Sequence, residues 1–177
     1  MDDHSKLAIT NIYHLYSDNV FKYIFYMVNN LHTAEDLTQE TFIKVFRHLD
    51  TFQFHSSIQT WVYQIARNTT LDYLKRKKLV SFFEPDKIVQ LIKGTERSVI
   101  DTVTQTEEKE QLYLYLLTLK KEYREVLILR KINELSVKET AVILRWSEDK
   151  VKSMSARGLK KLKETLQEKE ESWNESF

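Results

Sequence analysis

Apolar residues recur at every third or fourth position along the N-terminal part of the chain, which is the spacing of amphipathic α-helices. The pattern predicts helices through Ile9–Val28, Thr33–Leu49 and Ile58–Lys78, with an irregular stretch at Thr51–Ser57. Two acidic residues follow shortly after Thr33. We therefore expect Thr33 to cap the second helix, because acids are favoured at the positive end of the helix dipole.

The same spacing returns further along the chain, where Leu112–Leu119 and Tyr123–Ile132 predict two more helices. Ser136–Glu139 has the pattern of a capping box and predicts a short helix that ends near Leu144. Ser147 is followed by two acids, so it is expected to cap the next helix. Two capped helices with so short a connection have the spacing of a helix-turn-helix.

The second helix of this motif is suited to the major groove of DNA. Residues 150–163 contain six basic residues and no acid, and lysine and arginine can contact phosphates and guanine edges. Arg145 stands in the turn, where glycine is usual. If its backbone is left-handed, the strain is about 1–2 kcal/mol.

Composition limits the fold to the all-α class. The 177 residues include two glycines, one proline and no cysteine. β-Sandwiches and barrels need many turn residues, and phosphate-binding loops need closely spaced glycines, so both are excluded. Without cysteine there are no disulfides, no thiol catalysis and no zinc fingers.

Two small helical domains joined by a flexible linker are expected, because Pro85 and Gly94 fall together in a polar stretch. The predicted boundaries are a first domain at 1–80, a linker at 81–106, a second domain at 107–167 and a frayed acidic tail at 168–177.

Charge is distributed unevenly although the formal net charge is only +1. Basic residues gather at 67–78 and again at 150–163, with an acidic stretch between them. Such a distribution predicts contact with a polyanion at two places. The polar start of the chain and the shortness of its most apolar run, Val20–Val28, lead us to expect an unexported, cytoplasmic protein.

Four motifs in order resemble a known family. They are A-E-D-L-x-Q-E-x-F from Ala34, T-W-V-x-x-I-A-R-N-x-x-L-D-x-x-K-R from Thr60, Y-R-E-V-L-I-L-R from Tyr123, and V-K-S…A-R from Val151. Together they resemble an extracytoplasmic-function sigma factor, a two-domain subunit that gives bacterial RNA polymerase its promoter specificity. The resemblance covers about Tyr13 to Leu166, with a sigma-2 domain first and a sigma-4 helix-turn-helix domain second.

The resemblance implies three groups of site residues. The expected contacts with the clamp helices of core polymerase are Asp36, Gln39 and Glu40. The expected contacts with the −10 element are Phe54, His55 and Ser56, which would hold a flipped-out base, and Arg67, Asn68, Asp72 and Arg76. The expected contacts with the −35 element are Lys152, Ser153, Ala156, Arg157 and Lys160.

The resemblance also implies partners and regulation. Core RNA polymerase and promoter DNA are the expected partners, and an anti-sigma factor, often membrane-anchored in this family, is the expected inhibitor in an envelope or stress response. Met154 and Leu159 stand where the family often has arginine. The −35 sequence recognised by other family members therefore cannot be assigned to this chain.

Two other functions remain as alternatives. A stand-alone helix-turn-helix transcriptional regulator accounts for the basic helix but not for the motifs from Ala34 and Thr60. An enzyme is suggested by five histidines in the first third of the chain, but they lack the H-E-x-x-H and E-x-x-H spacings of helical metal sites. We predict no metal, no cofactor and no catalytic residue.

Overall fold

Two helical units make up the protein in a computed structural model. The structure describes residues 3–53, 55–83 and 107–174, with side-chain environments for 9–53, 55–78 and 112–167. Every regular element in these ranges is a helix, which confirms the predicted all-α class. The first unit is Met1–Val99 and the second is Ile100–Phe177. Residues 84–106, which hold most of the predicted linker, lie outside the described residues.

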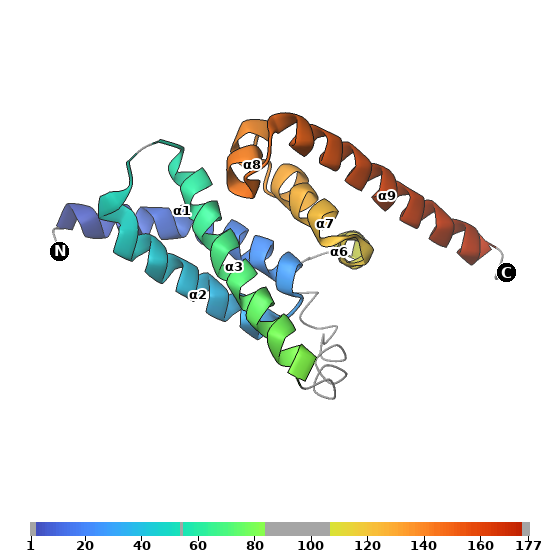
Figure 1. Ribbon diagram of the computed structural model, residues 1–177, viewed down its shortest axis with the longest axis horizontal. Coiled ribbons are helices and arrows are strands. Elements are labelled where there is room, and N and C mark those ends of the chain that lie inside the picture. The colour runs from blue at the N-terminus through green and yellow to red at the C-terminus, as the bar shows by residue number, and fades with distance from the viewer. Residues whose placement is uncertain (1–2, 54, 84–106, 175–177) are drawn as a thin grey trace. The chain divides into compact units, whose positions relative to one another are not determined.

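The described residues of the first unit form three long helices, and each of them packs against the other two (Figure 1). They are α1 (Asp3–Val28), α2 (Leu31–His48) and α3 (Ile58–Phe83), with the short 3₁₀-helix η1 (Leu49–Thr51) after α2. No helix in the described part of the chain combines the length and the apolar character needed to cross a bilayer.

The core of the first unit is built around the end of α1. The sequence predicts one apolar face there, but every side chain from Tyr23 to Val28 is buried. The reason is that α1 contacts both α2 and α3, so its last turns are covered from more than one side. Tyr23 meets Tyr63 of α3 edge to face, with ring centroids 5.9 Å apart.

The start of α2 differs from the prediction. Its N-cap is Asn30, whose side-chain oxygen accepts a hydrogen bond from the backbone N of Thr33 at 2.9 Å. Thr33 is therefore the third helical residue and not the cap. Asparagine ranks with the best N-caps, and Asn29 before it has a left-handed backbone that makes the tight connection from α1 possible.

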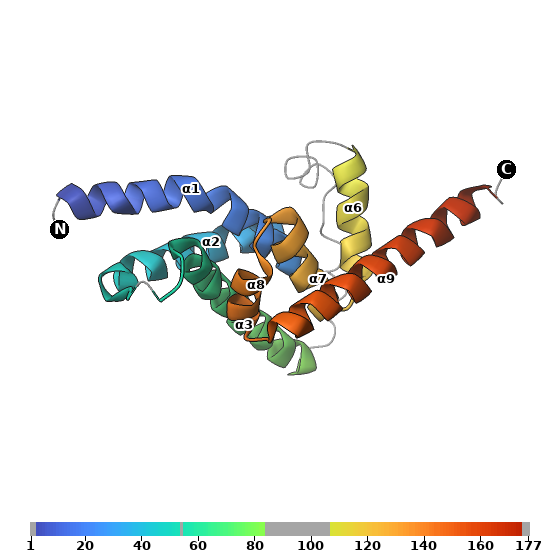
Figure 2. The same cartoon turned by 90° about the horizontal axis from the view of Figure 1, so that it is seen from above.

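The described residues of the second unit form four α-helices and one π-helical segment (Figures 1 and 2). They are α6 (Glu107–Thr118), α7 (Lys121–Leu127), the π-helical η2 (Ile128–Ile132), α8 (Val137–Leu144) and α9 (Glu148–Asn174). α9 packs against α6, α7 and α8. Its helix runs to Asn174, so the backbone of most of the predicted frayed tail is helical. Glutamate and lysine fill positions 168–171 at the start of this stretch, and both have good helix propensity.

The helix-turn-helix is confirmed in its local details. Ser136 Oγ accepts from the backbone N of Glu139 at 3.1 Å, and the Ser136 N donates to Glu139 Oε2 at 2.9 Å, which completes the capping box before α8. Ser147 Oγ accepts from the Lys150 N at 3.2 Å and caps α9. Ala141 and Val151 are buried where α8 and α9 pack together.

Arg145 has φ 57° and ψ 44°, so α8 ends in a left-handed residue at the turn position where glycine is usual. Replacing Arg145 with glycine removes the Cβ that makes this conformation costly and is expected to stabilise the second unit by about 1 kcal/mol. Urea unfolding of the full chain measures the change. Arg145→Ala is the matched control, because it shortens the side chain but keeps the Cβ and the strain. Equal stability of the two variants would contradict this explanation.

Gly158 lies where α9 packs tightly against α7. A Cβ at this position would lie 3.2 Å from both Cγ and Cδ1 of Leu127 and 3.4 Å from Cβ of Tyr123. We expect Gly158→Leu to destabilise the second unit by roughly 1–3 kcal/mol through overpacking. Ala156→Leu, an exposed change on the same helix, is expected to stay within about 0.5 kcal/mol of the parent. Thermal unfolding compares the two variants, and a Gly158→Leu protein as stable as the parent would show that α7 moves aside freely.

Candidate DNA and polymerase interfaces

The residues expected to contact the −35 element lie on one exposed face of α9, whose N-terminal end follows α8 after a short turn (Figure 2). The side chains of Lys152, Ser153, Ala156, Arg157 and Lys160 are all exposed. Val151, Gly158 and Leu162 are buried on the opposite side of the helix. The packing of α9 on the rest of the unit thus leaves the predicted DNA face open to solvent.

Some basic residues on α9 form ion pairs with a carboxylate of the same helix, and others do not. Lys152 Nζ lies 3.4 Å from Asp149 Oδ1, and Glu164 is paired with Lys160 at 4.0 Å and with Lys161 at 2.6 Å. The hydrogen bond from Lys161 lowers the pKa of Glu164 below its ordinary value. Arg157 has no carboxylate within ion-pair distance among the described residues. Its charge is therefore fully available to a polyanion.

Lys150 belongs to the basic run 150–163 but is not one of the −35 residues that the resemblance implies. Its Nζ lies 4.4 Å from the centroid of the Trp146 ring, in a cation–π contact that spans the turn and the first turn of α9. The sequence signal for this contact is an aromatic residue, Trp146, four positions before a basic residue, Lys150, on either side of the Ser147 cap.

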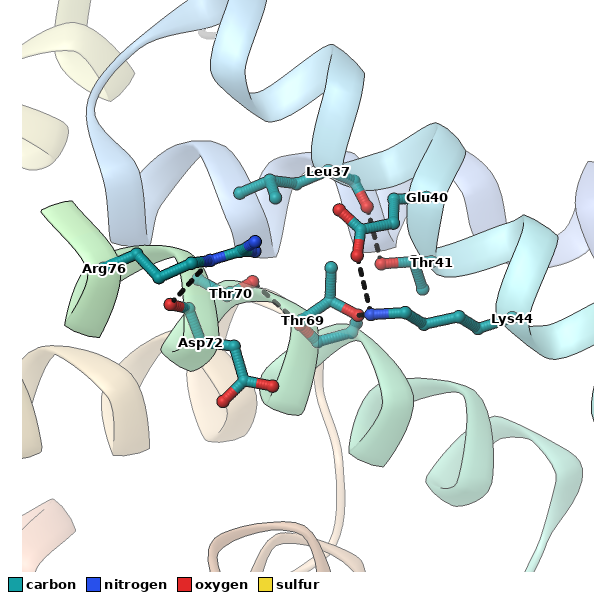
Figure 3. Close-up of polar contacts among 9 residues, drawn as sticks. Leu37, Glu40, Thr41, Lys44, Thr69, Thr70, Asp72 and Arg76 are labelled. Carbon is teal, nitrogen blue, oxygen red and sulfur yellow. Dashed lines mark hydrogen bonds and ion pairs between the residues drawn. The ribbon is translucent and has the colours of Figure 1, made fainter.

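The residues expected to bind polymerase lie on α2. Asp36 and Gln39 are exposed and Glu40 is half-buried, while Leu37 and Thr41 are buried on the other side of the helix. Figure 3 shows Lys44 lying between α2 and α3: its Nζ is 2.7 Å from Glu40 Oε1 and donates to Thr69 Oγ1 of α3 at 3.1 Å. Lys44 thus fixes the Glu40 carboxylate and ties the two helices together, a contact that no sequence pattern predicted.

The residues expected to meet the −10 strand form a row along α3. Asn68, Asp72 and Arg76 are exposed at four-residue intervals, so they share one face, and Arg67 beside them is half-buried. Arg76 Nε donates to the backbone O of Asp72 at 3.3 Å (Figure 3). The carboxylate of Asp72 lies 3.8 Å from Lys75 Nζ. These exposed polar and charged groups form a surface suited to a nucleic-acid backbone.

The loop before α3 is anchored at both sides of the predicted base-binding residues. Phe52 packs on Trp61 with ring centroids 4.9 Å apart, and Ser57 Oγ accepts from the Thr60 N at 3.1 Å to cap α3. Between them, His55 is exposed and Nε2 forms a hydrogen bond with Gln53 Oε1 at 3.0 Å.

Ser56 is half-buried and donates to the backbone O of Ser57 at 3.4 Å, whereas Phe54 lies outside the described residues. The structure therefore brings His55 and Ser56 together in the loop, and the expected position of Phe54 stays a prediction. Tyr63 is buried, whereas Trp61 is only half-buried, so the Trp61 ring remains partly exposed to solvent.

Comparison with known proteins connects both units to one family. Residues 12–80 match the family model described as Sigma-70 region 2, and residues 109–162 match Sigma-70, region 4. The chain is 36% identical to RNA polymerase sigma factor YlaC of Bacillus subtilis over 90% of this chain and 92% of the relative. It is 34% identical to ECF RNA polymerase sigma factor SigM of the same organism, over 89% and 94% respectively.

Two solved structures share the fold. Sigma factor RpoE, in complex with anti-sigma factor NepR from Bartonella quintana, has a TM-score of 0.72 at 18% identity, covering 89% of this chain and 96% of its own. CnrH, in complex with the cytosolic domain of CnrY, has a TM-score of 0.69 at 19% identity, with coverages of 92% and 89%.

The fold and the comparisons together define a two-domain subunit of the bacterial transcription machinery. The chain belongs to the extracytoplasmic-function (ECF) sigma factors. It is thus an alternative sigma factor, a protein that binds core RNA polymerase and directs promoter-specific initiation of transcription.

Proposed function

We propose that the exposed face of α9 reads the −35 element through Lys152, Ser153, Ala156, Arg157 and Lys160. The observation that carries this assignment is the charged, solvent-facing side of α9, the second helix of a helix-turn-helix in which both helices are capped. The N-terminal part of such a recognition helix enters the major groove, where arginine binds guanine and lysine neutralises phosphate.

The first unit has two roles in this proposal. Asp36, Gln39 and Glu40 of α2 bind the clamp helices of core polymerase. The row Arg67, Asn68, Asp72 and Arg76 on α3, with Phe54, His55 and Ser56 before it, holds the −10 strand. Unpaired bases stacked there contribute about 1–3 kcal/mol each, which favours the open promoter because the closed duplex does not present them.

The proposal extends to the setting in which the protein works. The chain catalyses no covalent step itself, because the polymerase synthesises the RNA. It works in the cytoplasm, where polymerase and promoter meet. The two solved neighbours were captured with an anti-sigma factor and with the cytosolic domain of CnrY. These complexes support control of this chain by an anti-sigma factor, and the proposal places this control in an envelope or stress response.

A pull-down from fragmented genomic DNA tests the proposal, with tagged chain alone and with tagged chain plus core polymerase. We expect enrichment of fragments that share a two-part motif only when core polymerase is present. Strong enrichment of an operator-like site by the chain alone would instead support a stand-alone regulator.

A further inference from the structure

Trp146 and Lys150 form a fixed pair at the entrance of the recognition helix. The Lys150 Nζ lies 4.4 Å from the ring centroid of Trp146. The backbone on both sides is held by caps: the Trp146 N donates to Ala141 O at 3.0 Å, and the Lys150 N donates to Ser147 Oγ at 3.2 Å. The stack is therefore built into the turn of the helix-turn-helix.

The charges around this pair leave Lys150 as the available cation of the first turn of α9. Glu148 and Asp149 are exposed acids, and Asp149 takes Lys152 as its ion-pair partner at 3.4 Å. Lys150 itself is exposed, and no carboxylate lies within ion-pair distance of it in the described part of the chain. A DNA phosphate approaching this end of α9 would otherwise meet two acids.

We propose that Lys150 binds a phosphate of the promoter element read by α9, and that Trp146 is a positioning residue that holds the Lys150 ammonium toward that phosphate. The inference rests on the proposed −35 role of α9. A lysine side chain has many rotamers and loses them on binding. Because the Trp146 ring already restricts Lys150 in the free protein, less freedom is lost when DNA binds. Lysine acts as a point charge, which suits a phosphate better than a base edge.

The test uses holoenzyme assembled from core polymerase and the full chain, with a promoter fragment selected by the genomic pull-down. Binding is measured between about 50 and 200 mM salt, a range over which phosphate contacts weaken strongly. Lys150→Gln is expected to weaken binding several-fold at low salt and to reduce the slope of log K against log salt by about 0.9, the value for one phosphate. Lys150→Arg keeps the charge and is expected to retain the slope.

Trp146 is tested by a double-mutant cycle. Trp146→Leu is expected to weaken binding about two- to fivefold in the parent and to have no further effect in the Lys150→Gln background. Trp146→Phe keeps an aromatic ring and is expected to lose less, so the positioning role stays testable if the leucine variant folds poorly. Lys120→Gln removes an exposed charge outside α9 and is the matched control for Lys150→Gln.

Three results would overturn the inference. An unchanged salt slope in Lys150→Gln would remove the phosphate contact, and additive effects of the Trp146 and Lys150 variants would remove the positioning role. If Lys150→Gln lowered the affinity for some promoter sequences and left the affinity for others equal to that of the parent, Lys150 would contact a base edge instead of a phosphate. If the parent holoenzyme selects no promoter at all, the proposed function itself is wrong. If the parent selects a promoter but the variants behave as described above, only the assignment of Lys150 and Trp146 is wrong.

Discussion

Replacing Arg157 with alanine is expected to weaken promoter binding by the holoenzyme by about 1–3 kcal/mol, roughly five- to 150-fold, and to relax base preference at one position of the −35 element. Arg157 is exposed on the middle of the α9 face and has no ion-pair partner among the described residues. An arginine presented in this way can form two parallel hydrogen bonds with a guanine. Competition binding with promoter variants measures both effects.

Arg157→Lys is the control that separates base reading from charge. Lysine keeps the positive charge but loses the planar fork, so we expect most of the affinity to remain while the base preference relaxes. If Arg157→Ala lowered the affinity for every sequence alike, the residue would be a phosphate contact and its role in base reading would be wrong.

The double substitution Asp36→Asn and Glu40→Gln is expected to lower affinity for core polymerase about tenfold or more. Both changes keep the shape of the side chain and remove a negative charge from the α2 face. Charged groups that become buried and hydrogen-bonded in an interface cost about 2–5 kcal/mol when one partner is lost. Titration of core polymerase with labelled chain measures the change.

Asp18→Asn is the matched control for the α2 variant, because it removes an exposed negative charge from α1 of the same unit. We expect it to bind polymerase as the parent does. If the control weakened binding as much as the double substitution, the effect would reflect the overall charge of the unit, and the α2 face would lose its assigned role.

Features set by neighbouring residues could be predicted from the sequence. The capping box of Ser136 and Glu139 and the Ser147 cap both depend on hydrogen bonds within a few residues. The family motifs are also short runs of neighbouring residues, and the resemblance that they carry implies the site residues on α2, α3 and α9.

Features that depend on packing between distant residues could not be predicted. Lys44 and Thr69 are 25 positions apart, so their hydrogen bond appears only when α2 lies against α3. The burial of all residues from Tyr23 to Val28 likewise follows from two helices covering α1. The π-helical segment at Ile128–Ile132 has no recognised sequence signature, and periodicity predicted an α-helix there.

Run-off transcription with purified core polymerase and fragmented genomic DNA, with and without this chain, tests the central claim most directly. We expect new transcripts only when the chain is present, all starting at a fixed distance downstream of one two-part motif. A set of transcripts identical to that of core polymerase alone, together with no association of the chain with the polymerase, would contradict the assignment.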